Sequence, residues 1–137
     1  MRFEDSLEQG YAKRIPPDII RAKSLIKASE QALSSVLKIP VEQDTLKTIL
    51  RELYEGLRQL CEALGYERGY KFSSHEAITY FLIDVLNEQK IGFQFDRYRK
   101  LRNGINYYGD EVSLVTVLEA KKEMVELVER LSKHLKK

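Results

Sequence analysis

The chain has 137 residues, of which 43% are hydrophobic and 32% are charged, a composition typical of one soluble globular domain spanning residues 1–137. Its net charge of +2 excludes the overall basicity that by itself indicates a nucleic-acid-binding protein, so such a function would need a local basic patch. A single cysteine, Cys61, excludes an internal disulfide and a thiolate zinc cluster. Because no apolar run approaches the roughly 20 residues of a membrane-spanning helix and residues 1–6 lack a signal-peptide pattern, we expect a cytoplasmic protein without a membrane partner.

The spacing of the apolar residues predicts an all-α fold, an antiparallel bundle of about five helices. A short amphipathic segment at residues 3–7 precedes the first long helix. The Pro16-Pro17-Asp18 sequence predicts where that helix begins, because proline is tolerated in a first turn and an acidic residue suits the positive end of the helix dipole. We expect this helix to reach about Leu37, since Pro40 prevents its continuation.

Six leucines predict a long second helix, with Asp44 as its N-cap and Gly65 at its end. They recur in a seven-residue rhythm at Leu46, Leu50, Leu53, Leu57, Leu60 and Leu64. Such a stripe is typical either of a dimeric coiled coil or of the core face of an antiparallel bundle. We favour the core face, because one short stripe does not identify its partner.

The sequence from Ser73 to Glu76 fits a capping box, in which Ser73 accepts a backbone hydrogen bond and Glu76 reaches back. It predicts a third helix that ends near Asn87, where a polar stretch and a glycine follow. The fourth helix is expected to begin near Gln94. Ser113 is a suitable N-cap for a last helix that runs to about residue 135.

The most unusual stretch is residues 95–109, where four cationic side chains fall within six residues. On a helix Arg99, Arg102 and Asn106 share a face that can remain in water. The neighbouring face, predicted to pack into the bundle, carries Tyr98, Leu101, Ile105 and Tyr108. Arginine and amide groups suit a phosphate, and tyrosine rings offer surfaces on which a base can stack. The alternative is an ordinary solvated charged face.

The whole chain resembles a HEPN domain (higher eukaryotes and prokaryotes nucleotide-binding), in particular the prokaryotic members that pair with minimal nucleotidyltransferases. In that family a late helix carries an arginine, usually followed by asparagine, and then a histidine a few positions on. The matching segment here is Arg102-Asn103-Gly104-Ile105-Asn106-Tyr107. The order of the expected helices is also similar to that of the family.

The resemblance implies a helical bundle paired about a two-fold axis, and for many members a metal-independent endoribonuclease activity. Arg102 would hold the scissile phosphate, with Asn103 as the polar residue beside it, whereas Tyr107 occupies the position of the histidine. A phenol with a pKa near 10 is a poor general base at neutral pH. In an unbroken helix residue 107 also lies about 140° around the axis from residue 102, so the helix would have to loosen at Gly104 or Gly109 to bring them together.

The two histidines are far apart in the sequence, and neither has acidic residues at metal-ligand spacing, so we expect no metal site and no cofactor. His75 is placed to enter the site from the start of the third helix, although a histidine beside a capping box is more commonly exposed or bonded for structural reasons. His134, in the basic C-terminal segment, is expected to face solvent. Cys61 lies between leucines and is expected to be a core residue.

Three functions follow from these patterns. The first is binding of a nucleotide or an RNA phosphate, with weak or absent catalysis; its residues would be Arg99, Arg102, Asn103, Asn106 and Tyr107. The second is an RNA-cleaving toxin in which Arg102 acts with Tyr107 or His75. The third is a non-catalytic helical protein that uses its leucine stripe and basic face to bind a nucleotidyltransferase partner in a toxin–antitoxin system, with Tyr107 or Tyr108 as a site of nucleotide attachment. We also expect a homodimer.

Overall fold

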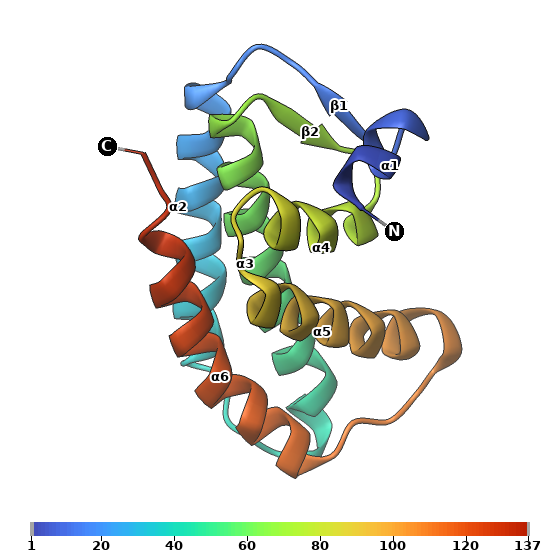
Figure 1. Cartoon of the computed structure of the whole chain (residues 1–137). Coiled ribbons are helices and arrows are strands. Elements are labelled where there is room, and N and C mark those ends of the chain that lie inside the picture. The colour runs from blue at the N-terminus through green and yellow to red at the C-terminus, as the bar shows by residue number, and fades with distance from the viewer. Residues whose placement is uncertain (1, 137) are drawn as a thin grey trace.

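The computed structural model describes residues 2–136 and confirms the predicted all-α class. Its elements in chain order are α1 (Phe3–Glu8), β1 (Ala12–Arg14), α2 (Ile19–Val36), a 3-10 turn (Gln43–Thr45), α3 (Leu46–Glu67), β2 (Tyr70–Phe72), α4 (His75–Asp84), α5 (Gln89–Tyr108) and α6 (Leu114–Ser132). Helix α3 packs against both α2 and α6, while α5 projects away from these three helices (Figure 1). Within the described residues, no helix combines the length and apolarity needed to cross a bilayer.

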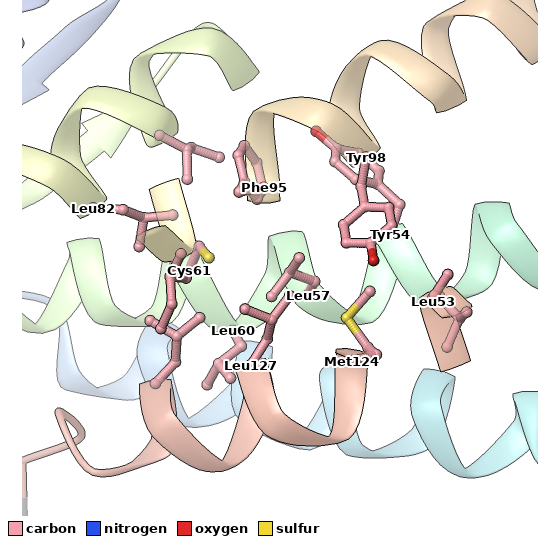
Figure 2. Packing of buried hydrophobic residues seen from close by; sticks show 14 of the residues in the cluster. Leu53, Tyr54, Leu57, Leu60, Cys61, Leu82, Phe95, Tyr98, Met124 and Leu127 are labelled. Carbon is pink, nitrogen blue, oxygen red and sulfur yellow. The ribbon is translucent and has the colours of Figure 1, made fainter. Parts of the chain in front are cut away.

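The leucine stripe of α3 forms the centre of the core, as predicted for a bundle. All six leucines are at most 5% exposed. Side chains from α3, α4, α5 and α6 meet around Leu57 and Leu60 (Figure 2). Full burial of a leucine contributes about 1.5–3 kcal/mol, so this stripe is a principal source of stability. Because it is enclosed within one chain, it is not available as a coiled-coil surface for a partner.

Two glycines of α3 allow close packing. A Cβ on Gly56 would lie 2.6 Å from Leu33 of α2, and Ser29 donates a hydrogen bond of 2.6 Å to the Gly56 carbonyl. A Cβ on Gly65 would lie 2.5 Å from the Phe72 ring. The prediction that Gly65 ends this helix is therefore wrong: the residue continues the helix and makes room for an aromatic ring.

A two-stranded antiparallel sheet, which the sequence analysis did not predict, joins the chain near its start to the segment after α3. Ala12 pairs with Phe72 and Arg14 with Tyr70. The sheet brings Phe72 against Phe81 of α4, with ring centroids 5.2 Å apart. It thereby fixes the position from which α4 begins.

Several predicted helix ends are confirmed and others are wrong. Asp18 and Ser113 cap α2 and α6 through hydrogen bonds from the backbone N–H groups of Arg21 and Thr116. Asp44 instead lies in the 3-10 turn before α3.

The ends of α4 and α5 also differ from the prediction. Ser74, not Ser73, caps α4, since the Ser73 hydroxyl donates 2.7 Å to the Gly10 carbonyl. Helix α4 ends at Asp84 rather than near Asn87, and α5 begins at Gln89, five residues earlier than expected. The glycine at position 92, which was expected to interrupt the helices, lies within α5.

Of the remaining predictions about single side chains, some are confirmed and others are wrong. Cys61 is completely buried, as expected. His134 does not face solvent freely: it is half-buried, and its Nε2 lies 2.8 Å from Glu88. Tyr98 and Ile105 pack into the core, but Tyr108 is 81% exposed because α5 has already passed the body of the bundle.

Candidate functional site

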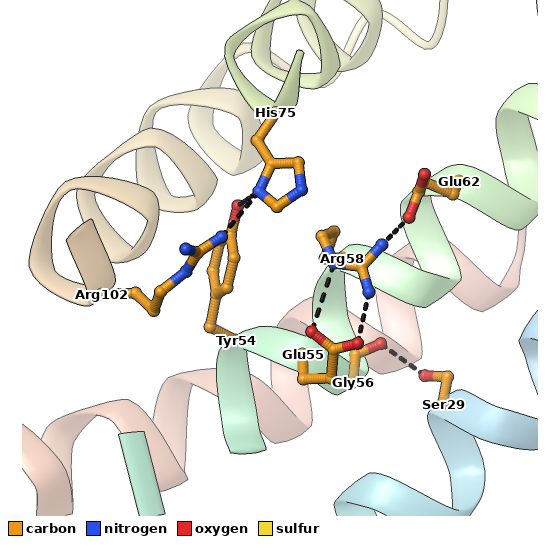
Figure 3. A network of polar contacts seen from close by, with 8 residues as sticks. All are labelled: Ser29, Tyr54, Glu55, Gly56, Arg58, Glu62, His75 and Arg102. Carbon is orange, nitrogen blue, oxygen red and sulfur yellow. Dashed lines mark hydrogen bonds and ion pairs between the residues drawn. The ribbon is translucent and has the colours of Figure 1, made fainter. Parts of the chain in front are cut away.

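A histidine, an arginine and a tyrosine from three different helices meet where α5 leaves the bundle. His75 is the first residue of α4, Arg102 lies on α5 and Tyr54 lies on α3. Nδ1 of His75 is 2.8 Å from Nη2 of Arg102 and 3.0 Å from the Tyr54 hydroxyl oxygen. The Arg102 guanidinium carbon also lies 5.0 Å from the centre of the Tyr54 ring, within the range of a cation–π contact (Figure 3).

Tyr54 forms the floor of this site. Its side chain is 1% exposed and its ring packs against Phe95, with centroids 5.5 Å apart. A buried tyrosine needs a partner for its hydroxyl, and His75 supplies it. Burial raises the pKa of Tyr54 above its usual range, in spite of the nearby Arg102 guanidinium. The hydroxyl therefore stays protonated at physiological pH.

The surroundings of His75 hold its imidazole neutral. Burial, followed by the charges of Arg58 and Arg102, lowers the pKa of His75 to about 4. The start of α4 adds a further unfavourable effect on a positive charge, because the dipole of a helix is positive at its N-terminus.

The hydrogen bonds identify which nitrogen of His75 carries the proton. A guanidinium donates hydrogen bonds and does not accept them. Nδ1, which faces Arg102, must therefore accept, so the hydrogen of the neutral ring is on Nε2. Nε2 makes no hydrogen bond to any residue in the described range 2–136, and it is not sealed from solvent. The site thus presents an N–H donor next to a guanidinium.

Arg102 is the arginine that contacts His75, and no neighbouring acid neutralises its charge. Arg58 forms ion pairs with Glu55 and Glu62 (Figure 3). Arg99 donates hydrogen bonds of 2.9 and 2.7 Å to Asp96. Across residues 2–136, no carboxylate forms a salt bridge with Arg102.

The Asp96 carboxylate also has several partners besides Arg99. It receives a hydrogen bond of 3.2 Å from the Thr79 hydroxyl and lies 3.1 Å from the Lys100 ammonium. Although burial acts in the opposite direction, Arg99 and Lys100 lower the pKa of Asp96 below its usual range. Asp96 is therefore ionised at neutral pH and neutralises Arg99, whereas Arg102, which contacts His75, has no such partner.

The other residues predicted for the site are not brought to His75. Asn103 is half-buried on α5, and the side-chain Oδ1 of Asn106 accepts a hydrogen bond of 2.7 Å from Arg51. Helix α5 is continuous through Tyr108 and ends at Gly109 in the left-handed conformation, with φ +67°. Tyr107 consequently remains far around the helix from Arg102, and its side chain is 70% exposed.

Sequence reasoning named His75 and Arg102 as candidates but missed Tyr54 and Arg58. A signal for Tyr54 was present, because it stands among the leucines on the buried side of α3 and a buried phenol requires a polar partner. In the part of the chain that the structure covers, no group of three or more His, Cys, Asp and Glu residues is arranged to hold a metal ion.

Comparison of the chain with protein-family models, with curated proteins and with solved structures finds no match.

Proposed function

We propose that this chain is a HEPN-like module that binds a phosphate group of RNA or of a nucleotide at Arg102. The observation that carries the proposal is the uncompensated guanidinium of Arg102 beside the free Nε2–H of His75. Together they offer several N–H donors and one positive charge, the combination that favours a phosphate oxygen pair. The resemblance of the Arg102–Tyr107 segment to the HEPN motif points to the same ligand class.

The proposal is tested by comparing two arginine variants on the same helix. Arg102→Ala removes the guanidinium of the site, whereas Arg97→Ala makes the same change of charge at a position 48% exposed and close to Glu119 and Glu123. Binding of a labelled 5′-phosphorylated RNA is measured by fluorescence anisotropy at low salt. We expect Arg102→Ala to weaken binding at least about tenfold, since a charged hydrogen bond is lost, and Arg97→Ala to change it less than about twofold. Equal effects of the two variants would exclude a site at Arg102.

Binding without cleavage fits the protonation of the site. A general base must offer a lone pair to the ribose hydroxyl. The Nδ1 lone pair of His75 points toward Arg102 and Tyr54, while Nε2 already carries hydrogen. Tyr107, the other candidate base, is too far around α5 to act with Arg102.

The alternative is a metal-independent endoribonuclease, and the contact between the imidazole and the guanidinium favours it. Incubation of purified protein with RNA in EDTA separates the two functions. We expect intact RNA. Cleavage that disappears in both Arg102→Ala and His75→Ala would establish the enzyme instead.

A nucleotidyltransferase partner in a toxin–antitoxin pair is a further candidate, and the exposure of Tyr107 and Tyr108 supports it. Their side chains are 70% and 81% exposed near the end of α5. In nucleotide attachment a phenol oxygen would bond to the α-phosphorus of ATP, with release of pyrophosphate and the phenolic proton. Intact-mass measurement after incubation with ATP and such an enzyme tests this, and an unchanged mass excludes it.

We also propose that two copies pair, as the family resemblance implies. The part of α5 that carries Asn106, Tyr107 and Tyr108 extends beyond the bundle and is exposed. Sedimentation equilibrium should give twice the chain mass of 16.0 kDa. A monomer at high protein concentration would exclude the pair.

A further inference from the structure

Nδ1 of His75 lies between two hydrogen-bond donors that differ in one respect. The guanidinium of Arg102, at 2.8 Å, can only donate, whereas the hydroxyl of Tyr54, at 3.0 Å, can donate or accept. While Arg102 stays in place, a hydrogen on Nδ1 would face an N–H group. If Arg102 turns toward a bound anion, that obstacle is removed.

Tyr54 is already placed to accept a hydrogen from a doubly protonated His75. A rotation of its hydroxyl hydrogen reverses the direction of the existing hydrogen bond without any movement of the heavy atoms. Nδ1–H would then donate to Tyr54, and Nε2–H would donate to the anion. Both N–H groups of the imidazolium would have a partner, which a half-buried charge requires.

In the empty site the surrounding charges oppose this protonation. The charged and titratable groups that face His75 are Tyr54, Glu55 and Arg58 from α3 and Arg99 and Arg102 from α5. Glu55 is paired with Arg58, and Arg99 is paired with Asp96. An anion beside His75 would add a negative charge close to the ring and so favour its protonation.

We propose, on the premise that Arg102 binds phosphate, that His75 takes up one proton when the site is filled and that the site thereby prefers a phosphate monoester to a phosphodiester. The proton comes from solvent and forms a bond with the Nδ1 lone pair; the O–H bond of Tyr54 and all bonds of the ligand remain intact. A monoester, with a second pKa near 6, carries nearly two negative charges at pH 7.5. Arg102 neutralises one of them and the imidazolium the other. A phosphodiester, with one charge, is neutralised by Arg102 alone.

Calorimetric titration measures both parts of this inference. The probes are uridine 5′-monophosphate, a tetrauridine RNA with a 5′-phosphate, and the same RNA with a 5′-hydroxyl. Titrations at pH 7.5 in Tris and in HEPES report proton uptake, because the two buffers differ in their heat of ionisation. We expect proton uptake on binding of the monoester, increasing as the pH is lowered, and close to none for the 5′-hydroxyl RNA. The monoester RNA should bind at least about tenfold more tightly, because the imidazolium neutralises its second charge in addition to Arg102.

The first two probes distinguish the source of the monoester. Equal affinity for uridine 5′-monophosphate and the phosphorylated RNA indicates a free nucleotide as ligand, while tighter binding of the RNA indicates an RNA end. Proton uptake with either supports the inference.

Two variants and one spectroscopic measurement assign the proton to His75. His75→Gln keeps an N–H donor but cannot take a proton, and Tyr54→Phe removes the acceptor for Nδ1–H. In both variants we expect proton uptake to disappear and the preference for the monoester to fall below about threefold. In the wild type, the ring C–H signals of His75 should shift to imidazolium values on addition of the monoester, with the signals of His134 as an internal reference.

Uptake that persists in His75→Gln would place the proton elsewhere and overturn the inference. Arg102→Ala separates this failure from that of the proposed function. If Arg102→Ala loses binding but the wild type takes up no proton, the phosphate site stands and the role of His75 is wrong. If Arg102→Ala binds normally, the phosphate site itself is wrong.

Discussion

His75 is predicted to make the folded protein less stable in acid. The ordinary pKa of histidine is 6.5, which applies in the unfolded chain, whereas burial together with Arg58 and Arg102 lowers the pKa of His75 in the folded chain to about 4. Between these two values the unfolded state binds more protons than the folded state. The free energy of unfolding therefore falls as the pH falls from about 6.5 to 4, and this contribution is absent above that window.

The size of the effect follows from the same two values. One pKa unit corresponds to about 1.4 kcal/mol, so at pH 5 the unscreened penalty would be about 2 kcal/mol. Because the ring is only half-buried, screening by solvent reduces it to about 1 kcal/mol. For a domain of this length, that corresponds to a fall in melting temperature of roughly 3–5 °C.

Urea unfolding at pH 7 and pH 5 measures this contribution when the wild type is compared with His75→Gln. We expect the wild type to lose about 1 kcal/mol more than the variant between the two pH values. His134→Gln is the matched control, since it removes the other imidazole and should leave the contribution of His75 in place. Parallel pH profiles for the wild type and His75→Gln would refute the burial and charge environment described for this ring.

Three further predictions concern the bundle. Gly65→Ala should lower the free energy of unfolding by about 1–3 kcal/mol in urea, because its Cβ would lie 2.5 Å from the Phe72 ring; unchanged stability would show that the ring moves freely. Ser113→Ala should cost about 1 kcal/mol in the same assay, since the Thr116 N–H loses its cap, and no loss would mean that the start of α6 is frayed. The thiol of Cys61 should react with Ellman's reagent in urea but not in buffer, because it is fully buried and burial raises its pKa; rapid reaction in buffer would contradict its place in the core.

The helices were predictable where the determining contacts are local. Asp18 and Ser113 cap the backbone three residues away, so their roles can be read from short sequence patterns. Ser73 and Ser74 could not be distinguished in this way. Their roles are decided by the Gly10 carbonyl, which is 63 residues from Ser73 and accepts a hydrogen bond from the Ser73 hydroxyl.

The glycine at position 92 led to a wrong helix start for the same reason. Glycine often ends a helix, but here a Cβ would lie 2.5 Å from Ile83, so the residue serves the close approach of α5 to α4. That approach is a property of the folded chain. A single sequence does not distinguish a glycine needed for packing from a glycine that ends a helix.

The candidate site was predictable in its parts but not in its arrangement. Arg102 could be named from the cationic stretch and the HEPN-like motif, and His75 from its place at the start of the predicted third helix. Their contact depends on how α5 packs against α4, which the close approach at Gly92 and Ile83 brings about in the folded chain. The sequence analysis assigned Arg99 to ligand binding, although its pairing with Asp96, at a spacing of three residues, is a local contact that the sequence could have indicated.

Of the three arginines around His75, Arg58 and Arg99 are ion-paired and Arg102 is available for a ligand. Glu55, Glu62 and Asp96 are the acids engaged in this neighbourhood, and they are held by Arg58, Arg99 and Lys100. Arg102 instead contacts a neutral imidazole and a neutral phenol, neither of which cancels its charge. Because a partly buried charge is stabilised by a counterion, an anion from outside the chain provides what the fold does not. The same reasoning predicts that an acidic side chain introduced near Arg102 would pair with the guanidinium. Phosphate binding would then be abolished without loss of the fold.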